Sequence, residues 1–225
     1  MNWVALVLWG GWVGADTTSF AQVMISRPIV AATGAGLILG RPVEGLTVGV
    51  LLEIFALIIL PIGAARYPEY GTAAVAACAG YVHAVTEGAP AAGALFLAVA
   101  FGLLWERVAG ATVTALRRAN ERLVAGAAEQ GAFTAGRLER LHLAALGADF
   151  ARAALVVGVG SGAALLLLRF AGPVWAIGES ATAGALAVAA ATMLAGTQAL
   201  FDGWAGRRVT FGLGLLCGLA ILLSR

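Results

Sequence analysis

The apolar residues of this chain gather into eight runs, and this pattern restricts the environment in which the chain can fold. The runs cover residues 3–15, 28–40, 45–65, 70–86, 88–105, 153–168, 183–201 and 209–223. Hydrophobic residues make up 61% of the chain and charged residues only 12%, whereas a soluble domain carries roughly 25% charged residues. A soluble core of 225 residues could not bury so much apolar surface, so we predict that the chain lies in a lipid bilayer.

The runs are solid rather than alternating, which predicts α-helices and argues against a membrane β-barrel. A helix needs roughly 20 apolar residues to cross a bilayer, and several of the runs are shorter than that. Short apolar segments interrupted by glycine or proline are typical of transporters whose backbone turns back at membrane depth. We therefore predict an all-α, polytopic membrane protein with about six to seven transmembrane helices plus re-entrant or half-helix segments.

Charge divides the chain into three regions. Residues 106–152 hold seven of the 14 basic residues and five acidic ones, and their apolar residues recur at helical spacing. This pattern predicts an amphipathic helical linker, which the positive-inside rule places on the cytoplasmic side of the membrane. The linker separates an N-terminal membrane region, 1–105, which contains the candidate site motifs, from a C-terminal membrane region, 153–225.

The residues that are missing exclude several kinds of chemistry. All 14 basic residues are arginine, so the lysine of a phosphate-binding P-loop and the lysine of a Schiff base are both absent. His83 and Glu87 lie four residues apart on one helical face, but no second pair accompanies them. We therefore predict no catalytic residue, no metal site, no cofactor and no nucleic-acid partner.

Glu53 is the most informative residue, because it interrupts the apolar run 45–65. A carboxylate at the centre of a membrane helix costs about 2.5–3.5 kcal/mol and normally faces a cavity, a partner or a substrate. It also accepts hydrogen bonds from hydroxyl groups, which suits a sugar. The alternative is a structural pair with an arginine, or with free backbone groups at a broken helix.

The segment that follows Glu53 supplies further candidates for substrate binding. Gly63 allows a turn or a close approach to a ligand, and Ile62, Gly63 and Ala64 offer backbone amides that no helix uses. Glu69 adds a second carboxylate a few residues later. The alternative is an ordinary interhelical loop in which Arg66 and Glu69 form a charge pair.

Four further polar residues are predicted to be structural or to gate a movement: Asp16, Arg27, His142 and Arg152. Asp16 could pair with Arg27 or cap a helix, and Pro28 suits the first position of a helix. Asp149 and Arg152 lie three residues apart, the spacing of an ion pair on one helix face.

Several of these motifs occur in an order that resembles a known family. The motifs are Arg27-Pro28-Ile29-Val30, Gly36-Leu37-Ile38-Leu39-Gly40, Glu44-Gly45, Gly49-Val50-Leu51-Leu52-Glu53, Ile62-Gly63-Ala64-Ala65 and Pro68-Glu69. They resemble the membrane C component of bacterial phosphotransferase systems of the mannose/fructose/sorbose type. The resemblance covers residues 16–87 and, with fewer matching positions, residues 106–190.

The resemblance implies a specific function. Such a component is the sugar-translocating membrane subunit of a phosphoenolpyruvate-dependent system and is no enzyme on its own. It pairs with a membrane D component, and cytoplasmic A and B components carry the phosphoryl group on histidines. We accordingly expect a multi-pass protein of the bacterial inner membrane, an oligomer in the bilayer, that carries a hexose or amino-hexose by an elevator-like movement. By resemblance, Glu53 and the turn 62–65 border the sugar.

Two other functions fit the same residues. A proton-coupled transporter of a small solute would use Glu53 and His83, and a membrane scaffold or regulatory subunit would hold partners without transport. Ile58 and Pro61 stand where some relatives carry a small and a polar residue, so the identity of the sugar stays open.

Overall fold

The computed structural model describes residues 2–57, 68–129, 134–200 and Leu216. In these ranges the secondary structure consists of seven helices without a strand. The helices are α1 (Trp3–Thr18), α2 (Pro28–Ile38), α3 (Pro42–Ala56), α4 (Tyr70–Thr86), α5 (Ala91–Glu129), α6 (Ala135–Ala171) and α7 (Glu179–Leu200). The prediction of an all-α fold is confirmed, whereas the apolar run 209–223 lies outside the described residues apart from Leu216.

Prolines set several of the helix boundaries. Pro28 and Pro42 occupy the first positions of α2 and α3, where the missing amide hydrogen costs nothing. The start of a helix at Pro28 was predicted from the sequence. Pro90 precedes α5 and Pro173 follows α6, and no proline lies between them. Since no proline interrupts either helix, α5 and α6 reach 39 and 37 residues.

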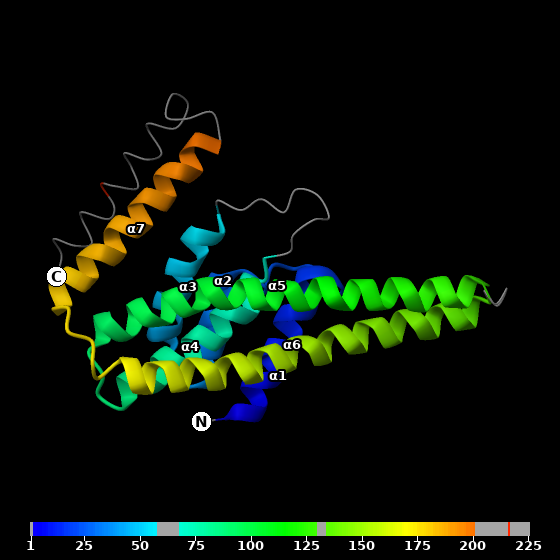
Figure 1. Ribbon diagram of the computed structural model, residues 1–225, viewed down its shortest axis with the longest axis horizontal. Helices are drawn as coiled ribbons and strands as arrows, with labels where there is room; N and C mark the ends of the chain where they lie inside the picture. The colour runs from blue at the N-terminus through cyan, green and yellow to red at the C-terminus, as the bar shows by residue number, and fades with distance from the viewer. Residues whose placement is uncertain (1, 58–67, 130–133, 201–215, 217–225) are drawn as a thin grey trace.

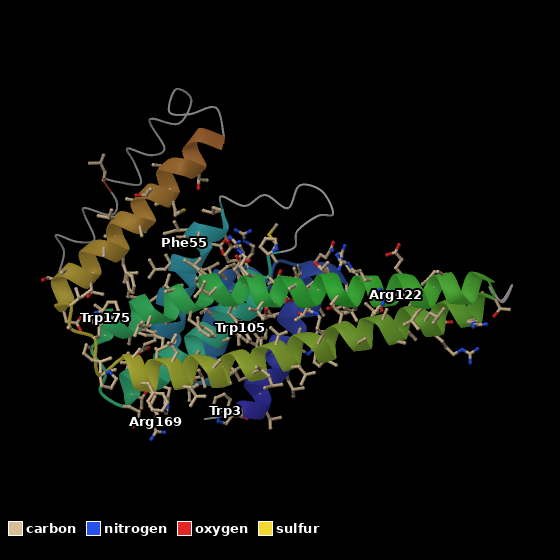
Figure 2. All side chains as sticks on the ribbon, in the orientation of Figure 1. Trp3, Phe55, Trp105, Arg122, Arg169 and Trp175 are labelled. Carbon is tan, nitrogen blue, oxygen red and sulfur yellow. The ribbon has the colours of Figure 1, made fainter. Side chains whose placement is uncertain are left out.

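The two long helices α5 and α6 lie antiparallel, side by side, and extend well past the other helices (Figure 1). Residues 106–152 therefore do not form a helix of their own: they are the second part of α5 and the first part of α6. We call the described part of 118–148 the arm. Its exposed side chains include Leu123 and Leu138, and Arg122 lies on it, far from the end that carries Trp175 (Figure 2).

The centre of the molecule is α4, which packs against α2, α3, α5 and α6. Its side chains from Ala73 to Ala79 are fully buried, and most of them are alanine, which lets the neighbouring helices approach closely. The same close packing joins α1 to α6: a methyl group built on Gly14 would come within 2.2 Å of the Cβ of Ala153. The region before the arm and the region after it therefore pack against each other.

In the part of the chain that the structure describes, three helical segments are long and apolar enough to cross a membrane: Ala91–Gly126, Ala135–Ala171 and Glu179–Thr197. Exposed apolar side chains follow the outer surface of α6, among them Leu155 (68% exposed) and Val159 (62%). Such side chains suit contact with lipid. An aromatic pair lies near each end of the uncharged stretch 153–168 of α6. The ring centroids are 5.5 Å apart for Trp12 and Phe150, and 5.1 Å apart for Phe96 and Trp175. The chain is a membrane protein, as the sequence predicted.

Candidate functional site

Glu53 lies opposite the start of α2, and its carboxylate is paired. The guanidinium of Arg27 donates two hydrogen bonds to Oε1 of Glu53, the one from Nε at 2.7 Å. The backbone amide of Ile29, in the first turn of α2, donates to Oε2 at 3.2 Å. The carboxylate therefore stabilises the positive end of the α2 dipole as well as the arginine. The structural alternative considered for Glu53, a pair with an arginine and with free backbone, is present in this conformation.

Asp16 holds the loop that leads to Arg27. It is buried, and its two oxygens accept the backbone amides of Val23 at 2.7 Å and Ser26 at 3.0 Å. Neither role considered for it is present: Asp16 does not pair with Arg27, and it does not cap a helix that begins at Thr17, because it lies within α1, which ends at Thr18. The loop carries three non-glycine residues with positive φ, namely Ala21, Gln22 and Met24. Such backbone conformations are unfavourable alone, so the two hydrogen bonds that Asp16 accepts help to fix the loop and the position of Arg27 at its end.

A pocket of about 310 Å³ opens beside the Arg27–Glu53 pair. Its described lining residues are Thr17, Thr18, Gln22, Ser26, Arg27, Pro28, Ala56, Pro68, Tyr70, Gly71 and Arg117. Arg27 therefore separates the pocket from Glu53, and the polar lining consists of hydroxyl groups, an amide and guanidinium groups. Such groups can bind a ligand rich in hydroxyls.

The predicted backbone contacts of Ile62, Gly63 and Ala64 lie outside the described residues. The described residues next to that segment, Ala56 before it and Pro68 after it, both line or adjoin the pocket of Arg27. The role of the three residues stays a prediction.

Glu69 belongs to a second network of hydrogen bonds, which is buried. Its partner there is Arg152, 83 residues away in sequence. Both of its oxygens accept hydrogen bonds from the two terminal nitrogens of Arg152, each at 2.8 Å. Arg152 also donates to Asp149 at 2.8 Å and to Thr112 at 3.0 Å. The predicted Asp149–Arg152 pair is confirmed. The Glu69 side chain is fully buried, so it positions Arg152 here and does not line the pocket.

The same network reaches the end of α1. The hydroxyl of Thr18 donates to Oδ2 of Asp149 at 3.0 Å, and the hydroxyl of Ser19 donates to the same oxygen. A second pocket, of about 260 Å³, lies here between α1, α5 and α6, with His142, Asn120 and Asp149 among its lining residues. Thr18 and Arg117 line both pockets. His142 is thereby placed beside this polar region, at the base of the arm.

Two features of the site were missed by sequence reasoning. The pairing of Glu69 with Arg152 had no local signal, because the sequence offered Arg66 as a nearer partner. Glu106 is also buried, with its side chain 2% exposed, and its Oε2 has no hydrogen-bond partner among the described residues. A signal for it existed: Glu106 directly follows the apolar run 88–105, with no turn residue between. In the described ranges, no group of three or more histidine, cysteine, aspartate or glutamate residues could hold a metal ion.

Known proteins provide an independent comparison. A profile of the family described as "PTS system sorbose-specific iic component" matches residues 1–166. No curated protein matches the chain. Among the solved structures that match the chain are two that share its fold. One, titled "Structure of membrane protein", has a TM-score of 0.69 at 19% identity and covers 99% of this chain and 91% of its own.

The second is titled "CryoEM Structure of Mannose Transporter ManYZ and Microcin E492 (MceA) complex". It has a TM-score of 0.53 at 19% identity and covers 96% of this chain and 85% of its own. At this identity the two structures support the fold alone. The family profile spans most of the chain, from α1 to within α6, and includes both networks described above. The chain belongs to the family of sorbose-specific IIC components of the phosphotransferase system, which are membrane components of sugar transport.

Proposed function

We propose that this chain is the sugar-translocating subunit of a phosphoenolpyruvate-dependent phosphotransferase system of the mannose/fructose/sorbose type, in a bacterial inner membrane. The observation that carries the proposal is the pocket beside Arg27, whose guanidinium is held by Glu53. A pocket of about 310 Å³ lies at the small end of the range for ligand sites and suits a single hexose or amino-hexose.

The Arg27–Glu53 pair offers both kinds of hydrogen bond that a sugar needs. A guanidinium donates to hydroxyl oxygens, and a carboxylate accepts from hydroxyl hydrogens. Arg27 is 38% exposed on its side chain and Glu53 is 17% exposed, so the arginine meets the ligand first. We propose that a sugar takes over one of the bonds between the pair and thereby reaches Glu53, while residues 62–64 supply backbone contacts. In this proposal Glu69 does not contact the sugar and instead positions Arg152.

The partners are proposed on the same basis. A fold shared with one structure that contains a mannose transporter supports assembly with a membrane D component. The arm, with its alternating arginines and acids, is the part of α5 and α6 that extends past the other helices (Figure 1). We propose that it lies in the cytoplasm, where it faces the phosphoryl-carrying A and B components, and that it forms the linker between the two membrane regions 1–105 and 153–225.

The test uses membrane vesicles that hold the full chain with its D partner. Saturable binding of labelled mannose, fructose and N-acetylglucosamine is measured for the native chain, for Glu53→Gln and for Glu44→Gln. Glu44 is the matched control, because it lies in the same helix and also pairs with an arginine, Arg41, at 3.1 Å. We expect one sugar to bind, at least about tenfold loss of affinity in Glu53→Gln, and no change in Glu44→Gln.

Two outcomes would contradict the proposal. If an assembled complex binds none of the sugars, the pocket beside Arg27 is not a sugar site and a scaffold role is favoured. If uptake follows a proton gradient and continues without a phosphoryl donor, the chain is a proton-coupled transporter. Loss of binding in both Glu53→Gln and Glu44→Gln would show that any weakened α3 is enough, and would remove the special role of Glu53.

A further inference from the structure

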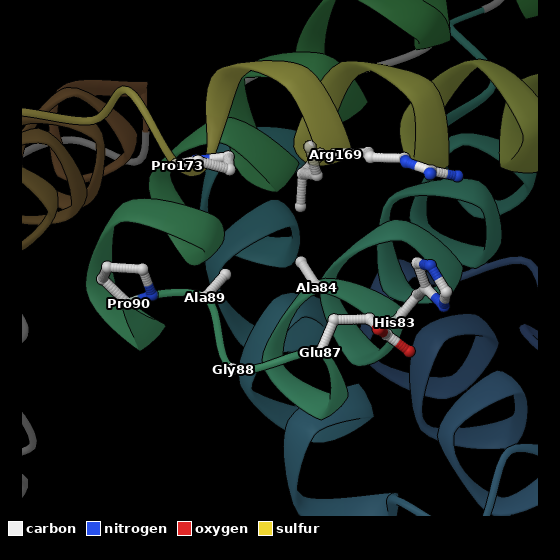
Figure 3. Close-up of a pocket in the computed structure, with 9 residues that line it drawn as sticks. His83, Ala84, Glu87, Gly88, Ala89, Pro90, Arg169 and Pro173 are labelled. Carbon is white, nitrogen blue, oxygen red and sulfur yellow. The ribbon is translucent and has the colours of Figure 1, made fainter.

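A third pocket, of about 510 Å³, lies at the end of the molecule away from the arm. It is formed where α4 ends, where the turn 88–90 leads into α5, and where α6 ends (Figure 3). Its lining residues are His83, Ala84, Glu87, Gly88, Ala89, Pro90, Leu168, Arg169 and Pro173. None of them belongs to the two networks at the other end of α4, so this pocket is separate from the candidate sugar site.

Charges of both signs face this pocket. Arg169 comes from α6, while His83, in the last turn of α4, and Glu87, the C-cap residue of α4, lie opposite it (Figure 3). Among the described residues, the ion pairs and side-chain hydrogen bonds of the structure involve none of these three side chains. The cation and the anion therefore lie across a cavity without neutralising each other. A ligand that carries a negative and a positive group could bind both.

The pocket lies at the boundary of the apolar part of the protein. From Ala153 to Leu168, α6 carries no charged residue, and Arg169 is the first cation after that stretch. Leu166 (58% exposed) and Phe170 (71% exposed) flank Arg169 on the outer surface. Trp175, whose ring packs on Phe96, lies in the turn after the end of α6. Tryptophan at the end of an apolar span is typical of the membrane–water interface, so the ligand of this pocket meets water and lipid together.

We propose that this pocket binds the zwitterionic headgroup of an aminophospholipid, such as phosphatidylethanolamine. Arg169 donates to the phosphodiester, His83 adds a donor beside it, and the Glu87 carboxylate accepts from the ammonium group. The acyl chains lie along Leu166 and Phe170. A lipid with a phosphate but no amine would leave Glu87 beside an uncompensated negative charge, and like charges at short distance repel. The pocket therefore selects the amine-bearing lipid over phosphatidylglycerol.

The test uses the purified full chain, depleted of lipid in detergent, and native mass spectrometry to measure binding of phosphatidylethanolamine and phosphatidylglycerol. We expect the native chain to prefer phosphatidylethanolamine by about fivefold or more. Arg169→Gln should weaken binding of both lipids. Glu87→Gln should remove the preference, because only the ammonium contact is lost. The matched controls are Arg140→Gln and Glu139→Gln on the arm, which should leave both affinities unchanged.

Three results would overturn the assignment. Equal binding of the two lipids by the native chain would show that no amine is recognised. Soluble glycerophosphoethanolamine that binds as tightly as the lipid would show that the acyl chains do not contribute and that the ligand is a free phosphodiester. If the Gln variants lose thermal stability, Arg169→Lys and Glu87→Asp replace them, and loss of the preference in these charge-conserving variants would also count against the proposal. No readout depends on sugar, so this test is independent of the proposed transport function.

Discussion

Arg152 in α6 donates two hydrogen bonds of 2.8 Å, one to each carboxylate oxygen of Glu69, the residue that precedes α4. The arginine side chain is 9% exposed and the glutamate is fully buried. A two-point contact of this kind fixes the rotation of both side chains as well as their distance. It ties the start of the central helix to the helix that continues into the arm.

The first prediction concerns the energy of this buried pair. Glu69→Ala leaves the buried Arg152 with Asp149 as its remaining anionic partner, and Arg152→Ala leaves both buried carboxylates without their cation. Each substitution alone should lower the free energy of unfolding by about 3–5 kcal/mol. The double variant should lose clearly less than the sum, with a coupling of about 2–3 kcal/mol. Unfolding in mixed detergent micelles measures all four proteins. The exposed Arg41–Glu44 pair is the control, for which coupling should stay at about 0.2–1 kcal/mol. Additive effects at Glu69 and Arg152 would show that the pair is not coupled.

The second prediction concerns which position of the Arg27–Glu53 pair carries the anion. The exchange Arg27→Glu with Glu53→Arg keeps opposite charges together, but it places a cation against the amide of Ile29 at the positive end of α2. That arrangement should cost about 1–2 kcal/mol, so the double variant should be no more stable than Glu53→Gln. Thermal unfolding of the solubilised proteins is the measurement. Recovery of native stability would mean that attraction between the two side chains is all that matters here.

The third prediction concerns the contact between α1 and α6. A methyl group on Gly14 would approach the Cβ of Ala153 to 2.2 Å, whereas one on Gly162 would meet nothing within 4 Å. Gly14→Ala should therefore destabilise the protein by about 1–3 kcal/mol through overpacking. Gly162→Ala should leave stability unchanged or raise it by about 0.5–1 kcal/mol. Equal effects of the two substitutions in the same unfolding assay would contradict the close packing of α1 on α6.

The fourth prediction concerns orientation in the membrane. Seven of the chain's 14 basic residues lie in 106–152, and the positive-inside rule therefore predicts that the arm lies in the cytoplasm. In a background where Cys78 and Cys217 are alanine, Leu123→Cys on the arm should react with a membrane-impermeant maleimide only after the cells are permeabilised. Thr86→Cys, at the end of α4 that lies away from the arm, should react with the same maleimide in intact spheroplasts. The reverse pattern would place the arm outside the cell.

The local rules of helix formation predicted much of the fold from the sequence. The apolar run 70–86 has the bounds of α4, and Pro28 begins α2 as expected. The sequence predicts the long helices only in part, because the change from apolar to charged side chains at residue 106 indicates a new region there. The backbone of α5 and α6 does not respond to that change. No proline interrupts either helix, so the helical backbone continues, and only the surroundings of its side chains differ.

The candidate site was predicted less completely, for a physical reason. Glu53 stood out because one carboxylate in an apolar run is costly, but its partner could be any of several arginines. Glu69 and Arg152 meet only because α4 and α6 pack together, and periodicity along the chain carries no record of which helices are neighbours. Asp149 and Arg152 were predicted as a pair because helical spacing alone brings them together.

The end of α1 has a consequence for any large motion of this protein. Thr18 and Ser19 are fastened to Asp149 on the long hairpin, while Asp16, only two residues away, clamps the loop that ends at Arg27. The backbone of residues 16–19 thus connects the long helix α6 to the loop that borders the candidate sugar pocket. If α5 and α6 tilt relative to the other helices, one of two things must happen. Either the hydrogen bonds from Thr18 and Ser19 to Asp149 break, or the loop moves with the helices and the pocket changes shape.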